Sequence, residues 1–89
     1  MAKLSDERQT EILNRLAEIA RELDRDIALL DEMASTALKE ERRVVGRRVR
    51  RLTDELWLLI EEGRYIKWDL LSNASGLTKR EIYQGLNDS

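Results

Sequence analysis

Cysteine and histidine are both absent from this 89-residue sequence. Their absence excludes disulfide bridges, thiol nucleophiles, zinc fingers and catalysis by an imidazole acid or base. Among the remaining residues no carboxylate pair, serine–lysine arrangement or phosphate-binding loop stands out. We therefore expect neither an enzyme nor a bound cofactor.

Proline is also absent, glycine occurs four times, and the only aromatic residues are two tryptophans and two tyrosines. Because helix breakers are scarce and 38% of the residues are charged, the composition favours an all-α chain. A length of 89 residues with 42% apolar content predicts a single domain, residues 1–89, with a modest aliphatic core.

Long apolar runs are missing too. The longest spans residues 56–60, which is far shorter than a membrane span. The first residues lack the apolar segment of a secretory signal. We therefore expect a cytoplasmic protein with no membrane partner.

The formal net charge of −2 does not by itself favour a nucleic-acid partner, but the charges are unevenly distributed. Residues 1–34 carry five Lys and Arg against nine Asp and Glu, a net of −4. Residues 39–51 carry seven against two, a net of +5. The acidic excess thus belongs to the first third of the chain, and the middle is basic.

A first long helix is predicted from just after Ser5, a good N-cap, to a turn near residues 34–36. Its apolar residues recur at helical spacing on one broad stripe: Ile12, Leu13, Leu16, Ile19, Ala20, Leu23, Ile27, Leu30 and Ala34. Asp26 lies at the edge of this stripe, where we expect it to pair with an arginine.

A second long helix is predicted from about Ala37 to Glu62, ended by Gly63, with Ser35 and Thr36 able to cap its start. Its stripe contains Val45, Val49, Leu52, Leu56 and Leu59. The two helices would form a hairpin over residues 5–62, with lengths and spacing compatible with a coiled coil. The hydrophobic phase leaves open one continuous helix instead.

Trp57 and Leu58 lie well off the second stripe, so this turn of the helix is apolar almost all round. Such a turn needs cover on more than one side, either from the C-terminal segment or from a second subunit. We predict a homodimer in which Trp57 and Leu58 lie at or near the interface.

The C-terminal segment, residues 66–87, predicts two short helices joined by a turn at Gly76. Leu70 and Leu71 close the first, and Leu77, Ile82 and Leu86 form the apolar side of the second. Thr78 and Glu81 have the spacing of a capping box, which predicts that the second helix begins just after Thr78. Tyr65 and Trp68, at the entry to this segment, are expected to be core and hinge residues.

A helix, a glycine turn and a capped second helix resemble the helix-turn-helix of DNA-binding proteins. The resemblance covers about a quarter of the chain, residues 64–87. It rests on Ala74-Ser75-Gly76-Leu77-Thr78, similar to the turn of that motif, and on Ile82-Tyr83, similar to the apolar–tyrosine pair of bacterial and phage repressors. Two residues depart from the pattern: Ser72, where alanine is usual, and Gly85 inside the second helix.

The resemblance implies that the second C-terminal helix enters the major groove of DNA. Its outward residues would form the contact surface: Thr78, Lys79, Arg80, Tyr83, Gln84 and Asn87. Arg80 and Gln84 have the chemistry to read guanine and adenine, while Thr78 and Lys79 suit phosphate. A plain polar surface is the other interpretation of the same residues.

The segment Glu41–Arg51 contains six arginines, and Arg43 and Arg47 project away from the apolar stripe. Guanidinium groups suit phosphate geometry, so Arg43 and Arg47 are candidate contacts to an anionic partner. Alternatively, acidic residues of the first helix neutralise them; Asp24, Asp31 and Glu32 would lie nearby in a hairpin.

The sequence as a whole thus predicts an all-α protein, a dimeric hairpin with a C-terminal helix-turn-helix, that binds double-stranded DNA as a transcriptional regulator or accessory factor. The alternative is a protein-interaction module, in which the hairpin binds a protein partner and the C-terminal helices only cap its end. Near-neutral net charge favours the alternative, and the turn motif with the arginine run favours DNA.

Overall fold

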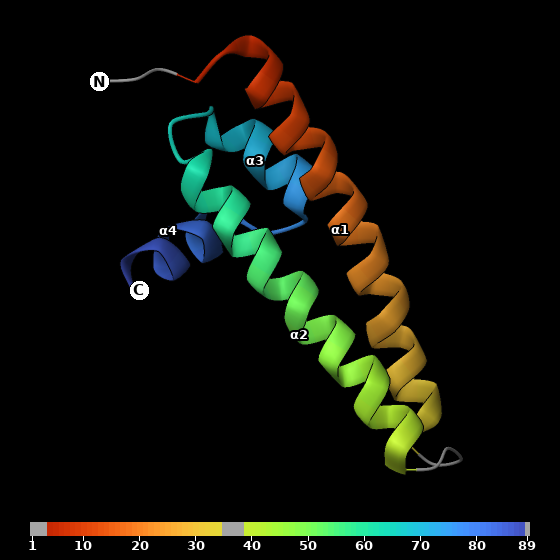
Figure 1. The fold of residues 1–89 in the computed structure, drawn as a ribbon. Helices are drawn as coiled ribbons and strands as arrows, with labels where there is room; N and C mark the ends of the chain where they lie inside the picture. Colours follow the sequence, from red (N-terminus) through yellow and green to blue (C-terminus); the bar gives the residue numbers. More distant parts are fainter. Residues whose placement is uncertain (1–3, 35–38, 89) are drawn as a thin grey trace.

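The computed structural model describes residues 4–34 and 39–88. These residues form four helices, α1 (Asp6–Met33), α2 (Lys39–Glu62), α3 (Trp68–Ser75) and α4 (Lys79–Asn87), and contain no strand. The all-α prediction is confirmed. Figure 1 shows α1 and α2 as a long hairpin, with α3 and α4 beside the end that holds the start of α1.

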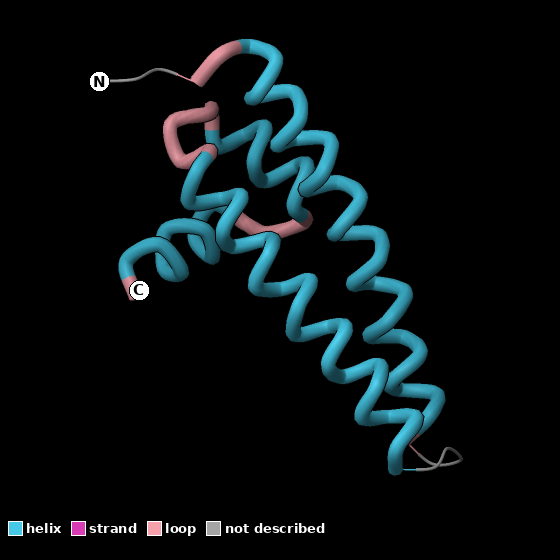
Figure 2. Tube along the Cα trace, in the orientation of Figure 1, coloured by secondary structure: helices cyan, strands magenta, loops and turns pink. Residues whose placement is uncertain are grey.

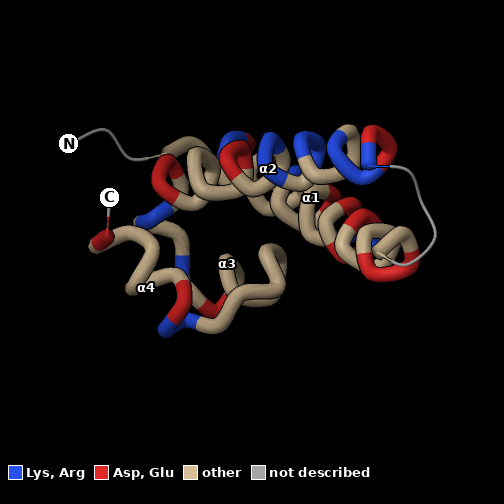
Figure 3. Tube along the Cα trace, turned by 90° about the horizontal axis from the view of Figure 1, so that it is seen from below, with Lys and Arg blue, Asp and Glu red and all other residues tan. Residues whose placement is uncertain are grey.

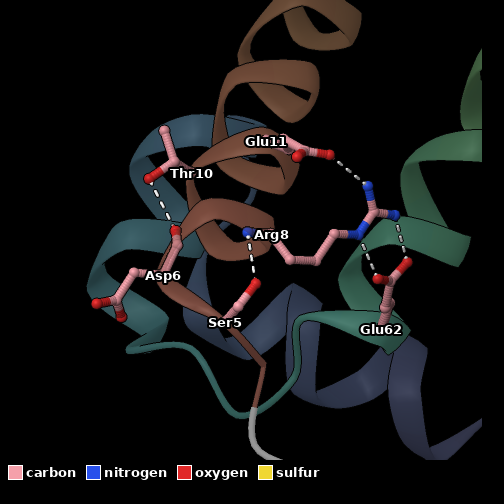
Figure 4. Close-up of polar contacts among 6 residues, drawn as sticks. All are labelled: Ser5, Asp6, Arg8, Thr10, Glu11 and Glu62. Atoms are coloured by element: carbon pink, nitrogen blue, oxygen red, sulfur yellow. Dashed lines mark hydrogen bonds and ion pairs between the residues drawn. The ribbon is translucent and has the colours of Figure 1, made fainter.

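The hairpin begins where Ser5 caps α1, because the Ser5 hydroxyl accepts a hydrogen bond of 3.2 Å from the backbone N–H of Arg8 (Figure 4). Helix α1 ends at Met33, and α1 and α2 then run side by side, so the alternative of one continuous helix is wrong (Figure 2). Within the described residues, α2 starts at Lys39. The predicted cap at Ser35 and Thr36 and the predicted start at Ala37 lie outside the described residues.

Two bidentate ion pairs join α1 to α2 along one edge of the hairpin. Arg8 donates to Glu62 at 2.5 and 2.7 Å (Figure 4), and Arg15 donates to Glu55 at 2.5 and 2.9 Å. The two arginines lie seven residues apart on α1, and the two glutamates lie seven residues apart on α2 in the reverse order along the chain. This is the register of an antiparallel coiled coil. All four side chains are more than a third exposed, so these pairs set the register more than the stability.

A third cross-helix pair joins Asp26 to Arg48, as predicted for Asp26. Arg48 donates to both carboxylate oxygens at 2.8 and 2.7 Å. The Asp26 side chain is only 7% exposed, whereas Arg48 remains 44% exposed. The hydrogen bonds from Arg48 lower the pKa of the Asp26 carboxyl below its ordinary value, so Asp26 stays ionised although it is buried.

The core lies where all four helices meet, at the end of the hairpin that carries α3 and α4. It consists of Ile12, Leu16, Ile19, Leu52, Leu56, Ile60, Ile66, Leu71 and Ile82. Partly buried residues, including Leu23 and Trp57, pack around this cluster. The C-terminal segment therefore shares one core with the hairpin.

The predicted apolar stripe is wrong at Ile27 of α1 and at Ala34, the C-cap residue that follows α1. Ile27 is 49% exposed and Ala34 is exposed, although both lie on the stripe that is buried further up the helix. The reason is the length of α3, which has eight residues and packs only on the N-terminal half of α1 (Figure 1). Towards the loop Ile27 is left half exposed, whereas Leu30 on the same stripe is partly buried.

Candidate nucleic-acid interface

The turn between α3 and α4 has the conformation predicted from Gly76. Gly76 adopts φ 76°, in the left-handed region, and is the only described residue with positive φ. Its N–H donates to the Ser72 carbonyl at 3.0 Å, which closes α3. A residue with a side chain would be strained at this φ, so glycine allows the chain to reverse here.

Two serine hydroxyls hold the same turn, and sequence reasoning missed their role. Ser72 donates to the Leu77 carbonyl at 2.6 Å, across the turn. The Ser75 hydroxyl donates to the Leu71 carbonyl at 2.6 Å and accepts from the Leu77 N–H at 3.2 Å. An alanine at position 72 could not make this hydrogen bond to the Leu77 carbonyl. The spacing of Ser72 and Ser75 to the glycine is the signal that could have found them.

Helix α4 begins at Lys79 with the predicted capping box. The Thr78 hydroxyl accepts from the Glu81 N–H at 3.1 Å, and the Glu81 carboxylate accepts from the Thr78 N–H at 3.0 Å. The hydrogen bond from the Thr78 backbone lowers the pKa of the Glu81 carboxyl. Both side chains are therefore engaged in holding the start of α4, and Thr78 has less freedom to contact phosphate than the sequence suggested.

The outward face of α4 presents Arg80 and Gln84. Both residues are exposed, and neither side chain makes a hydrogen bond or ion pair with the described residues. Ile82 is fully buried and Leu86 is partly buried, as predicted for the inward face. Arg80 and Gln84 thus lie one turn apart on the side of the helix away from the core, free to meet a partner.

Two other predicted contact residues have partners within the chain. Lys79 forms an ion pair with Asp69 of α3, and this contact lowers the pKa of the Asp69 carboxyl. Asn87 donates from its side-chain amide to the Tyr83 carbonyl at 3.0 Å. Both side chains stay exposed, so a partner could reach them only in competition with, or alongside, these contacts.

Tyr83 is 61% exposed and lies against Trp68, with ring centroids 6.5 Å apart and planes tilted by 52°. Trp68 is partly buried, and its indole N–H donates to the Arg64 carbonyl at 2.9 Å. The prediction that Tyr65 is a core residue is wrong, because Tyr65 is 72% exposed and stacks under the Arg64 guanidinium. The next residue, Ile66, is the one of the two that is buried after α2 ends.

Arg43 and Arg47 lie apart from α4, in the N-terminal half of α2. Both are exposed, and the structure shows no ion pair from either of them to Asp24 or Asp31. Figure 3 shows positive charge along this part of α2 beside the acidic end of α1. Arg47 lies ten residues before Trp57, about 15 Å along the helix from the level at which α4 packs.

Trp57 and Leu58 have different environments. Trp57 is partly buried and packs against Gly85 of α4, so the C-terminal segment supplies its cover. Leu58 is 67% exposed. Of the two predicted interface residues, Leu58 is the one left available to a second subunit.

Among residues 4–34 and 39–88, no acidic side chains cluster in a way that could hold a metal ion, and no helix has the length and apolar character needed to cross a bilayer. Comparisons of the chain with protein families, with curated proteins and with solved structures found no match. The assignment of a function therefore depends on the geometry of the chain itself.

Proposed function

We propose that this protein binds double-stranded DNA through α4, as a small transcriptional regulator or accessory factor. The observation that carries the proposal is the exposed pair Arg80 and Gln84 on the first two turns of a capped helix that follows a left-handed glycine turn. Arginine can donate two hydrogen bonds to guanine, and glutamine can pair with adenine, in the major groove. A helix that enters this groove reads bases with its N-terminal residues.

Two acidic residues next to this surface, Asp69 and Glu81, have partners within the chain. Asp69 is paired with Lys79, and the Glu81 carboxylate is held in the capping box. Their charges are therefore partly balanced by contacts within the chain, which reduces the repulsion that a phosphate backbone would meet. Arg43 and Arg47, which have no acidic partner among the described residues, would supply sequence-independent phosphate contacts.

A homodimer is part of the proposal, because two recognition helices read a symmetric site with far more affinity than one. Leu58 is the residue that favours this, since a leucine that is 67% exposed has apolar surface to bury. The proposed interface lies along the outward side of α2 around Leu58.

The test begins with duplexes selected by the wild-type protein from a random library. Arg80→Ala should weaken binding to the selected site by about 1–3 kcal/mol and relax the preference at one base pair. Arg47→Ala should weaken all duplexes alike and reduce the slope of log K against log salt by about one. Arg21→Ala, which removes the same charge from an exposed position on α1, is the control and should change neither.

The alternative function, a protein-interaction module, is favoured by the exposed apolar residues Ile27 and Leu58 and by the net charge of −2. The same experiment separates the two. If the folded wild-type protein selects no duplex at low salt, the DNA proposal fails, and the exposed apolar surface of the hairpin becomes the place to look for a partner.

A further inference from the structure

The closest approach between α4 and the hairpin lies at Gly85, where the backbone of α4 meets the indole of Trp57. A Cβ atom built on Gly85 would lie 2.8 Å from the Trp57 Cζ2 atom and closer still to Cζ3 and Cη2. Real Cβ atoms are not found this close to other heavy atoms, so no side chain fits at position 85 while the indole holds its place. This contact explains the glycine that departs from the helix-turn-helix pattern.

A comparison with Gly46 shows that the contact at Gly85 is specific. Gly46 also lies inside a helix, α2, but a Cβ atom built there would meet nothing within 4 Å. Glycine in a helix interior is less favourable than alanine at both positions. Only at Gly85 does the packing within the chain account for it.

The position of this contact along α4 matters for how the helix is held. The start of α4 is fixed by the turn and the capping box, and Ile82 anchors it in the core. Gly85 lies seven residues after Thr78, about 10 Å further along the axis. Two points of attachment separated by this length determine the direction of a helix, whereas one end alone leaves it free to tilt.

We propose that Trp57 and Gly85 are positioning residues, which together set the angle of α4 against the hairpin. The inference rests on the proposed function, because it assigns this angle to the helix that would read DNA. Gln84 adjoins Gly85, so a displacement of α4 at the joint moves Gln84 directly. A displacement of about 1 Å at a base-reading residue is enough to break hydrogen bonds, because these need a donor–acceptor separation near 3 Å.

The experiment is a double-mutant cycle with Gly85→Ala, Trp57→Leu and the double variant, and Gly46→Ala is the matched control. Two-dimensional ¹H–¹⁵N NMR reports the indole N–H of Trp57 and the amides of α4 without reference to DNA. Affinity is measured by fluorescence anisotropy with the duplex that the wild-type protein selects. Far-UV circular dichroism verifies that each variant keeps its helices.

We expect Gly85→Ala to shift the Trp57 indole and the α4 amides, to leave the amides of the loop-side half of the hairpin in place, and to weaken the duplex at least tenfold. Gly46→Ala should change neither the α4 amides nor the affinity. In the Trp57→Leu background the alanine has room, so the double variant should bind as well as Trp57→Leu alone. This restoration is a result that a general loss of stability would not produce.

Unchanged α4 amides in Gly85→Ala would overturn the inference, and so would an equal loss of affinity in both backgrounds. If Gly85→Ala unfolds the chain, Trp57→Leu is compared with the double variant instead. The proposal requires these two variants to have matching chemical shifts for the α4 amides, and different shifts would overturn it. If the wild-type protein selects no duplex, the DNA function fails by itself. The NMR cycle then still shows whether Trp57 and Gly85 set the angle of α4.

Discussion

Leu52 and Leu58 make a matched pair for testing where the core lies, because they are the same residue on the same helix. Leu52 is 6% exposed and belongs to the central cluster, whereas Leu58 is 67% exposed. Truncation of a buried leucine to alanine removes its burial and leaves a cavity, which together cost about 2–5 kcal/mol. Truncation of an exposed leucine stays within about 0.5 kcal/mol.

We therefore expect Leu52→Ala to lower the free energy of unfolding by about 3 kcal/mol and Leu58→Ala to leave it unchanged at low protein concentration. In a domain of this size each kcal/mol corresponds to roughly 4–8 °C, so Leu52→Ala should lower Tm by about 12–24 °C. The assay is urea unfolding followed by circular dichroism, with the same slope m required for all variants. Leu23→Ala, which removes a partly buried side chain, should fall between the two.

A loss of less than about 1 kcal/mol for Leu52→Ala would refute the assignment of the core. The Leu58 variant carries a second test when the titration is repeated at increasing protein concentration. A dimer that buries Leu58 makes the wild-type protein more stable as concentration rises, and Leu58→Ala should remove this dependence. Sedimentation equilibrium that finds only monomers at micromolar concentration would reject the dimer.

Two further predictions concern polar contacts. Because the pKa of Asp26 is lowered, its pair with Arg48 contributes stability above the ordinary carboxyl pKa of about 4, and this contribution is lost as the pH falls through the lowered value. Urea midpoints measured from pH 6 to 2 should therefore drop less in Asp26→Asn than in the wild type. Parallel curves for the two proteins would contradict this. Thr78→Ala should lose about 1 kcal/mol of stability and Thr78→Ser almost none, with faster amide exchange at Glu81 as the local measurement.

Local features of this chain could be predicted from the sequence because each depends on residues a few positions apart. Ser5 and Thr78 cap helices through N–H groups three residues on, and Gly76 reverses the chain where its neighbours would be strained. The helical repeat of apolar residues likewise predicted the long helices and the inward face of α4. Asp26, at the edge of a stripe, was correctly expected to meet an arginine.

Tertiary structure alone decided which parts of the predicted stripes are buried and what Gly85 does. Ile27 has the same helical phase as buried residues of α1, but its exposure depends on how far α3 extends, which periodicity does not encode. From the sequence, Gly85 was only an unfavourable residue inside a helix. The side chain that requires a glycine there, the indole of Trp57, lies 28 positions earlier on another helix. Short-range hydrogen bonds and steric limits are written in neighbouring residues, whereas burial and close packing arise only when distant helices share the same space.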